Sequence, residues 1–194
     1  MNFTEEMIKY GSFPKGERPE PYQEYYLNGS WQKGQRDIIK RTELMKFNPT
    51  KGDIILEIGC QTGGFLQYAW LKGSRNIYGI DIDKDYLRLA RELNNRNGFG
   101  INYLNYDITD NNFSEVLKPF INIDYLLLMS MGKHISEKRL FEIIDYLKPK
   151  TVYIETNAVN NKNPYPHLNE IKKRNGVVLS RTYDRNERIL YKIG

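Results

Sequence analysis

From residue 53 onward, short apolar runs alternate with longer amphipathic stretches, and this alternation constrains the fold more than any other feature of the chain. Such a pattern is typical of strand and crossover-helix units, in which helices bury both faces of a parallel sheet. It predicts five strands, at Ile54–Ile58, Asn76–Ile80, Asn102–Tyr106, Ile123–Met129 and Thr151–Glu155. The sequence therefore indicates an α/β protein.

Four helices are expected between these strands, and two of them have a clear helical periodicity. Lys84–Arg96 and Glu137–Leu147 each carry apolar residues at three- and four-residue spacing. Ser136 suits the N-cap of the second helix, and Pro149 suits a stop after it. Both helices are long enough to cover a face of the sheet.

The last part of the chain predicts a departure from an all-parallel sheet. A surface loop rich in Asn and Pro is expected at Asn157–Pro166, followed by a short helix near His167–Arg174. Two strand-like runs, Val177–Thr182 and Arg188–Ile193, are joined by five polar residues, 183–187. Because a joint this short makes an antiparallel hairpin, we expect a mostly parallel seven-stranded sheet that ends in such a hairpin.

Residues 1–50 differ in character, and we expect them to form an irregular and helical cover on one compact domain at residues 51–194. Between Gly11 and Gly34, prolines and aromatic residues predict irregular chain. A helix is expected over Gln35–Phe47. Its inward residues would be Ile38, Ile39, Thr42 and Met45, and its outward residues Arg36, Lys40 and Arg41.

Composition excludes several classes of protein. No apolar run approaches the ~20 residues of a membrane span, and the N-terminus lacks a signal-peptide pattern, so a soluble cytoplasmic protein is expected. Cys60 is the one cysteine, so no intrachain disulfide forms, and no His or Cys spacing suggests a metal site.

The net charge of +5 is unevenly distributed along the chain. The basic excess lies in residues 118–194, with 14 Lys and Arg against 8 Asp and Glu. This excess fits either an anionic partner such as RNA or a solvated surface.

The segment most informative about function is Leu56–Phe65, in which a strand runs into a glycine-bearing turn and then a helix. Glycines let the backbone turn tightly and approach a ligand. Asp81 ends the next strand about 20 residues further on, where an acidic side chain can take both hydroxyls of a ribose. Gln61 stands where a dinucleotide fingerprint has its second glycine, so NAD and FAD fit poorly. These features indicate a ligand that contains one adenosine and no pyrophosphate.

The spacing of Glu57, Gly59 and Gly63 resembles motif I of class I S-adenosylmethionine-dependent methyltransferases. Asn105–Ile108 is similar to the segment that contacts adenine in this family, and Ile123–Leu128 to its fourth strand, whose end faces the methyl group. The resemblance covers residues 53–156 and implies a Rossmann-like three-layer sandwich with a reversed seventh strand. The implied cofactor is S-adenosyl-L-methionine, and the implied product is S-adenosyl-L-homocysteine.

The resemblance also implies cofactor contacts at the ends of four strands. These residues are Glu57, Gly59, Cys60, Gln61, Gly63 and Phe65 in the turn, Asp81 and Ile82 after the second strand, Asp107 and Ile108 after the third, and Ser130 after the fourth. Cys60 is expected to fill space and to contribute only its backbone. The order Gly34-Gln35-Arg36, the glycine turn and His134 is similar to small-molecule and tRNA-wobble-uridine-modifying methyltransferases with a Tyr-His-Leu motif, which here is Lys133-His134-Ile135.

His134 is the candidate catalytic residue. It lies just past the strand end that should face the methyl group, where an imidazole can take a proton from a hydroxyl or acid acceptor. The alternative is a histidine that anchors the loop or caps the next helix. Glu155 ends the fifth strand on the same edge and is expected either to contact substrate or to pair with Arg36 or Lys133.

The expected acceptor is a hydroxyl or carboxyl group on a small molecule. Ser130-Met131-Gly132 stands where methyltransferases of exocyclic base amines carry Asn-Pro-Pro-Tyr or Asp-Pro-Pro-Tyr, and a second cysteine for covalent C5-pyrimidine methylation is absent. An RNA-modifying methyltransferase and a non-catalytic cofactor-binding protein are the alternatives. The aromatic N-terminal cluster fits packing over the cofactor, an acceptor-binding lid or an RNA stacking platform. Its members are Tyr22, Tyr25, Tyr26 and Trp31, with Arg36, Lys40 and Arg41 nearby.

Overall fold

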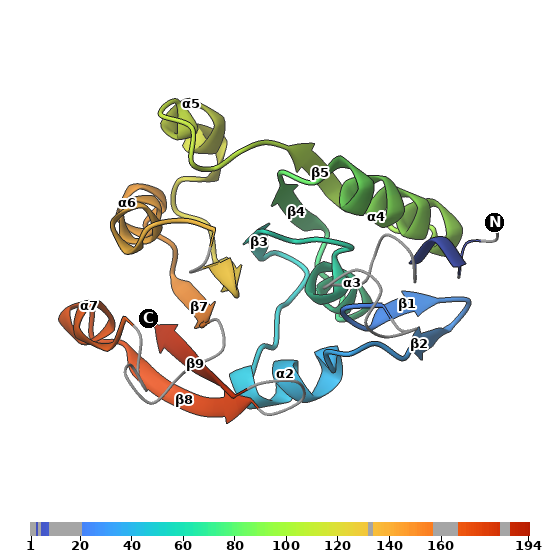
Figure 1. The fold of residues 1–194 in the computed structure, drawn as a ribbon, viewed down its shortest axis with the longest axis horizontal. Helices are drawn as coiled ribbons and strands as arrows, with labels where there is room; N and C mark the ends of the chain where they lie inside the picture. The colour runs from blue at the N-terminus through green and yellow to red at the C-terminus, as the bar shows by residue number, and fades with distance from the viewer. Residues whose placement is uncertain (1–2, 4, 8–20, 132–133, 157–166, 183–186) are drawn as a thin grey trace.

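The computed structural model describes residues 3, 5–7, 21–131, 134–156, 167–182 and 187–194. A seven-stranded sheet runs through them in the order β5-β4-β3-β6-β7-β9-β8 (Figure 1). Its strands are β3 (Ile54–Ile58), β4 (Asn76–Asp81), β5 (Asn102–Asn105), β6 (Tyr125–Met129), β7 (Thr151–Glu155), β8 (Val177–Thr182) and β9 (Arg188–Ile193). Neighbours from β5 to β7 are parallel, and β9 is antiparallel to β7 and β8. The predicted α/β sheet with an antiparallel C-terminal hairpin is confirmed.

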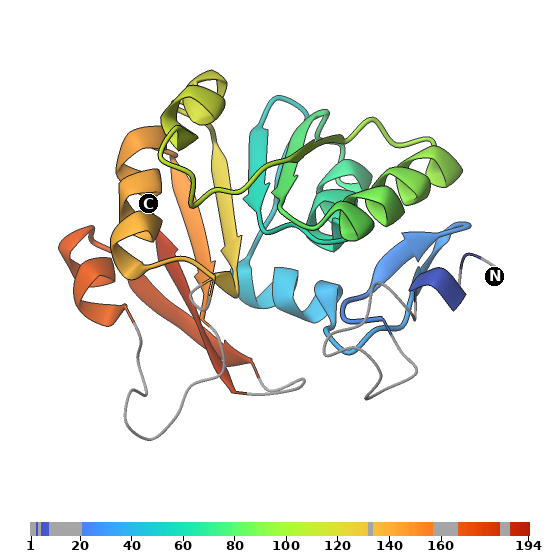
Figure 2. The ribbon, with the colours of Figure 1, turned by 45° about the horizontal axis from the view of Figure 1, so that its top comes forward.

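Helices cover both faces of this sheet and complete the three-layer sandwich (Figure 1, Figure 2). One face carries α2 (Ile38–Met45), α3 (Gly64–Leu71) and α4 (Lys84–Asn97). The other carries α5 (Phe113–Leu117), the 3-10 turn η1 (Lys118–Phe120), α6 (Glu137–Leu147) and α7 (Leu168–Lys173). All parallel strands end at the same edge of the sheet, which we call the C-terminal edge.

Alternate residues of a strand pack into different helical layers, because successive side chains point to opposite faces of a sheet. Leu56 packs with α5 to α7, whereas Ile55 packs with α2 to α4. By the same alternation Glu57 lies on the face of α2, and so does Glu155, which follows Tyr153. Two carboxylates therefore enter an apolar layer, and such burial requires a chemical explanation.

The helix ends follow local capping rules. Ser136 caps α6 by accepting a hydrogen bond from the backbone of Arg139, as predicted. The same helix ends at Leu147 and is followed by a C-cap residue, Lys148, whose left-handed backbone has φ 49°, directly before Pro149. Asp83 caps α4 by accepting bonds from the Asp85 and Tyr86 N–H groups.

The N-terminal part contains regular structure where irregular chain was predicted. β1 (Tyr25–Leu27) and β2 (Ser30–Gln32) form an antiparallel hairpin that lies beside α3 and α4. Asn28 and Gly29 form its turn with φ values of 52° and 85°. Two consecutive positive φ values are the mark of a type I′ turn, for which Asn-Gly is the preferred sequence. The prediction of irregular chain is therefore wrong at residues 25–32.

The predicted orientation of α2 is also partly wrong. Arg36, just before the helix, is fully buried, and Arg41 within it is nearly so, whereas Lys40 is exposed as predicted. Both arginines bond to the buried carboxylate of Glu155, which requires positive partners in an apolar layer. A tertiary charge requirement therefore outweighs the tendency of arginine to face solvent.

Three predicted segments lie wholly or partly outside the described residues, namely the irregular chain at 11–20, the loop at 157–166 and most of the polar joint at 183–187. Among the described helices, none has the length and apolar character needed to cross a membrane.

Candidate functional site

The glycine turn between β3 and α3 lies at the C-terminal edge and has a left-handed backbone at three positions. Gly59, Gln61 and Gly63 have φ values of 76°, 51° and 79°. A Cβ atom at Gly63 would also overlap the hydroxyl oxygen of Tyr103 on β5. Backbone conformation and lack of space therefore both require glycine at position 63.

Gly63→Ala is expected to lower the free energy of unfolding by about 1–2 kcal/mol from the left-handed backbone alone, and further through the overlap. Tyr103→Phe removes the overlapping oxygen, so the double variant should recover the second part of the loss. Thermal unfolding measures both. Gly73→Ala is the control, since its φ of 105° is strained while no atom lies within 4 Å of the added Cβ. Equal rescue of both alanine variants by Tyr103→Phe would contradict the steric explanation.

The carboxylate of Asp81, at the end of β4, is bonded to this turn. One oxygen accepts a hydrogen bond from the Gln61 N–H at 2.8 Å, and the other accepts from the Asp83 N–H at 2.9 Å. Burial raises the pKa of Asp81, and the two backbone hydrogen bonds act in the opposite direction. The structure thus brings the predicted acidic residue against the predicted turn.

Glu57, two residues before the turn, has a buried carboxylate with an unused acceptor. Its exposed fraction is 2%, and Oε2 has no hydrogen-bond partner among the described residues. Burial raises the pKa of Glu57 well above its ordinary value, while the charge of Arg41 acts to lower it. A buried acceptor without a donor costs about 1–3 kcal/mol. This position therefore favours a ligand group that donates a hydrogen bond or carries positive charge.

The raised pKa of Glu57 gives a pH prediction for the cofactor-free protein. The folded state holds the proton more tightly than the unfolded state, so the stabilisation is complete below the ordinary pKa of 4.5 and is lost as pH rises through the raised value. Glu57→Gln does not titrate, so its stability relative to wild type should increase as pH rises from the ordinary pKa of 4.5 into the alkaline range. Thermal unfolding across this range measures the difference, with the exposed Glu43→Gln on α2 as the control. A constant difference would contradict the prediction.

Two residues of the predicted cofactor set lie in the core behind the turn. Cys60 is buried against β4, where a Cβ at Gly79 would meet its sulfur, and burial raises the pKa of its thiol well above the ordinary value. Phe65 is fully buried, and the guanidinium of Arg41 lies 4.6 Å from its ring centroid. Their side chains pack, and only their backbone lies along the turn.

The ends of β4 and β5 bring further residues of the predicted cofactor set to neighbouring positions. Ile82 is 62% exposed, an unusual fraction for an isoleucine next to a buried aspartate, and Ile108 is nearly buried. Asn105 ties the two strands together by donating to the backbone oxygens of Asp81 and Ile82. Asp107 is exposed and accepts two bonds from Thr109, which lower its pKa. One oxygen of Asp107 therefore stabilises its own turn.

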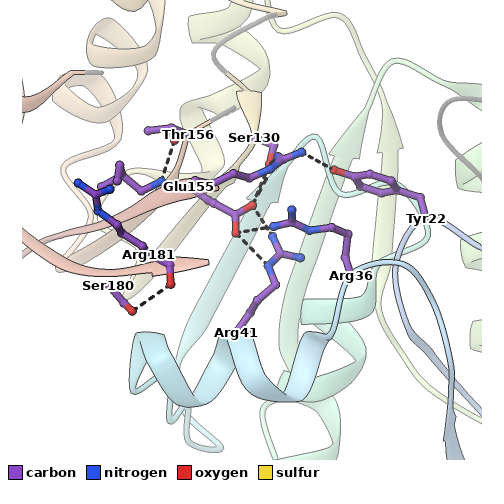
Figure 3. Close-up of polar contacts among 10 residues, drawn as sticks. Tyr22, Arg36, Arg41, Ser130, Glu155, Thr156, Ser180 and Arg181 are labelled. Carbon is purple, nitrogen blue, oxygen red and sulfur yellow. Dashed lines mark hydrogen bonds and ion pairs between the residues drawn. The ribbon is translucent and has the colours of Figure 1, made fainter. Parts of the chain in front are cut away.

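Charged residues cluster around Glu155 (Figure 3). The sequence indicated only part of this cluster. The Glu155 carboxylate accepts bonds from Arg36 at 2.8 Å, from Arg41 at 3.1 and 2.8 Å, and from the Ser130 hydroxyl at 2.8 Å. Arg188, at the start of β9, lies 3.7 Å away. Burial alone would raise the pKa of Glu155, but the three guanidinium groups outweigh it and hold the pKa below its ordinary value.

The predicted pairing of Arg36 with Glu155 is confirmed, whereas the roles of Arg41 and Arg188 were missed. For Arg41 a signal was present. Position 41 falls on the i, i+3, i+4, i+7 stripe that also holds Ile38, Thr42 and Met45, and this stripe is the inward face of a helix. Ser130, predicted as a cofactor contact, has a left-handed backbone with φ 66° and directs its hydroxyl into the cluster.

His134 is exposed and lies after β6, where its N–H donates to the backbone oxygen of Met131 at 2.8 Å. β4 and β6 are parallel strands that end at the C-terminal edge, so Asp81 and His134 both lie there. Lys133, the other predicted partner of Glu155, is outside the described residues. The structure thus places the candidate base on the same edge as the glycine turn.

The N-terminal segment lies directly on the glycine turn. Gln23 donates to the Cys60 backbone oxygen at 3.4 Å and to the Thr62 hydroxyl at 3.2 Å. Three residues further on, the N–H of Tyr26 donates to the side chain of Gln67 on α3 at 2.7 Å. The segment that precedes α2 therefore forms one wall of the site.

Comparison with known proteins agrees with this geometry. Residues 55–150 match the sequence pattern of a family described as "Methyltransferase domain". A Methanocaldococcus jannaschii protein named as a ribosomal RNA large subunit methyltransferase is 38% identical over 84 residues, which are 42% of this chain. The chain spans only 20% of that protein. A Methanobrevibacter smithii protein named as a cobalt-precorrin-6B C(15)-methyltransferase is 24% identical over 158 residues, 75% of this chain and 81% of that protein.

Among solved structures, the bifunctional kinase-methyltransferase WbdD is similar in fold, with a TM-score of 0.69 and 20% identity. The similarity covers 92% of this chain and 44% of the WbdD chain. At this identity the match shows the fold alone. The chain therefore belongs to the class I, Rossmann-like family of S-adenosylmethionine-dependent methyltransferases.

Proposed function

We propose that this chain transfers a methyl group from S-adenosylmethionine to a hydroxyl or carboxyl group of a small molecule. The observation that carries the proposal is the contact between Asp81 and the Gln61 N–H at 2.8 Å, which places a carboxylate against a glycine turn. A carboxylate in this position can accept bonds from both hydroxyls of a ribose.

The residues of this edge fit a nucleoside that carries a cationic amino-acid tail. Asp81 would hold the ribose, and the exposed Ile82 would lie along the adenine ring. The unused buried acceptor of Glu57 suits a positively charged donor such as an ammonium group. Gln61 stands where a pyrophosphate would need glycine, so the donor set favours a cofactor without phosphate.

Methyl transfer from a sulfonium requires little covalent chemistry from the protein. S-adenosylmethionine supplies an already activated methyl group when it is bound. The remaining tasks are to align the acceptor oxygen, to exclude water and to accept a proton where the acceptor is a hydroxyl. We assign proton removal to His134, because it lies on the same edge as Asp81 and is accessible to an acceptor.

We further propose that residues 1–50 act as a cover for the methyltransferase domain at residues 51–194. The contacts of Gln23 with the glycine turn and of Tyr26 with α3 support this division of roles. A segment that lies over the turn excludes water from one side of the bound cofactor.

RNA modification is the second candidate, because the relative that is 38% identical is named for ribosomal RNA methylation. Within the basic C-terminal third, however, Arg174 is paired with Asp145 and Glu170, and Lys173 is also paired with Glu170. Carboxylates therefore already compensate two of the charges that would bind phosphates. We favour the small-molecule acceptor for this reason.

Calorimetry with S-adenosylmethionine, S-adenosylhomocysteine and NAD tests the cofactor assignment. The first two are expected to bind and NAD is not, and the reverse result would overturn the proposal. Transfer of a labelled methyl group is then followed in small-molecule and RNA fractions of a cell extract. Label in RNA, with binding that falls steeply with salt, would favour the second candidate. Cofactor binding without any labelled product would indicate a non-catalytic binding protein.

A further inference from the structure

Arg188, at the start of β9, is a buried cation whose hydrogen bonds go to neutral hydroxyl groups. Its guanidinium donates to the Ser130 hydroxyl through Nη1 and to the Tyr22 hydroxyl at 3.3 Å through Nη2. Its exposed fraction is 7%, and Nε has no partner in the described part of the chain. Arginine stays protonated in proteins, so this site holds a full positive charge.

Glu155 lies near Arg188 but its hydrogen-bonding capacity is taken by other groups. Its Oε1 accepts from Arg36 and Arg41, and its Oε2 accepts from Arg41 and the Ser130 hydroxyl. An ionised carboxylate offers about four lone-pair sites, and these four bonds use them. Nη1 of Arg188 lies 3.7 Å from Oε2 of Glu155, so the two groups form an ion pair without a hydrogen bond.

The position of Arg188 determines which ligand group can reach it. In the sheet order β5-β4-β3-β6-β7-β9, Asp81 and Ile82 follow β4, whereas Ser130 follows β6 and Arg188 begins β9. β9 is antiparallel to β7, so its first residue lies at the C-terminal edge, beside the end of β7. Arg188 is therefore on the acceptor side of the glycine turn, away from the nucleoside side.

We propose that Arg188, with the hydroxyl of Tyr22, binds an anionic oxygen group, carboxylate or phosphate, of the methyl acceptor. The inference rests on the proposed function and narrows its substrate to anionic small molecules. A planar guanidinium offers paired donors that match the oxygens of either group. Tyr22 belongs to the N-terminal segment. When the anion enters, Arg188 and the Tyr22 hydroxyl both donate to it, in place of the 3.3 Å bond from Arg188 to Tyr22.

The test titrates the full chain, saturated with S-adenosylhomocysteine, separately with inorganic phosphate and with acetate, and follows binding by calorimetry. Wild type should bind one of the two anions saturably, and the preferred anion identifies the ligand group. Arg188→Met should weaken that binding by about tenfold or more, as expected for loss of a charge-assisted pair. Arg181→Met is the matched control, since Arg181 lies on the neighbouring strand β8 and pairs with Glu187. It should bind as wild type does.

Circular dichroism and thermal unfolding establish that the variants are folded, and Arg188→Lys serves if the methionine variant is not. The lysine variant keeps the charge but loses the planar fork, so we expect intermediate affinity. Absence of saturable anion binding, or equal binding by Arg188→Met, would overturn the proposal. So would competition between the anion and S-adenosylhomocysteine, which would assign Arg188 to the carboxylate of the cofactor.

The titration also separates this proposal from the proposed function. If S-adenosylhomocysteine fails to bind wild type, the proposed function is wrong. The same anion titration without cofactor then still decides whether Arg188 forms an anion site.

Discussion

Glu155→Gln is expected to lower the free energy of unfolding by about 3–5 kcal/mol, the cost of removing one partner from a buried ion pair. Glutamine keeps the size of the side chain and one acceptor oxygen, so the change removes mainly the charge. Arg36 and Arg41 then remain in an apolar layer without the carboxylate that they contact at 2.8 Å. Urea unfolding measures the loss as a lower midpoint at an unchanged slope.

A surface carboxylate provides the control for this prediction. Glu142 on α6 pairs with Lys138 at 3.7 Å in an exposed position, where an ion pair contributes about 0–1 kcal/mol. Glu142→Gln should therefore change stability little. The double variant Glu155→Gln with Arg41→Met should recover part of the loss, because one of the unpaired cations is removed with its partner. A loss below about 1 kcal/mol for Glu155→Gln would contradict the view that this carboxylate neutralises the cluster.

The fold was predictable from sequence because its main signals are local. β3 and β6 are apolar runs buried on both faces, as parallel strands must be, and α6 has both a periodic apolar face and a cap at Ser136. The short polar joint after β8 is also a local signal, and it predicted the antiparallel hairpin. The predicted end of β4 differs from the structure by one residue, because pairing with Asn105 on β5 extends the strand to Asp81.

The N-terminal hairpin shows a signal that was present but outweighed. Prolines and aromatic residues suggested irregular chain, yet Asn28-Gly29 specifies a two-residue turn by itself. The burial of Arg36 had no comparable local signal. It depends on Glu155, 119 positions away in the chain, whose carboxylate is buried by the sheet.

The candidate site also has a part that sequence predicts and a part that depends on the assembled fold. Asp81 and the glycine turn belong to adjacent strands of one β-α-β unit, so their contact follows from the connection rules of parallel sheets. The cluster around Glu155 draws on α2, β6, β7 and β9, and only the assembled sheet brings these elements together. Sequence therefore indicates the cofactor side of the edge better than the acceptor side.

Asp81→Ala is expected to weaken the binding of S-adenosylhomocysteine by about 100-fold or more. Hydrogen bonds to a charged group contribute about 1.5–3 kcal/mol each, and this carboxylate has two oxygens available to a ribose. The substitution also removes the bond to the Gln61 N–H, so the glycine turn loses a restraint in the cofactor-free protein. Calorimetry with the product, which cannot transfer a methyl group, measures affinity free of turnover.

The neighbouring carboxylate of Asp83 separates a specific contact from a general effect of charge. Asp83 caps α4 through bonds to the backbone of Asp85 and Tyr86, so Asp83→Ala should cost about 0.5–2 kcal/mol of stability. Its affinity for S-adenosylhomocysteine should nevertheless stay within about twofold of wild type, because its side chain serves the helix and not the turn. Equal weakening by both variants would mean that negative charge near β4, and not the geometry of Asp81, determines binding.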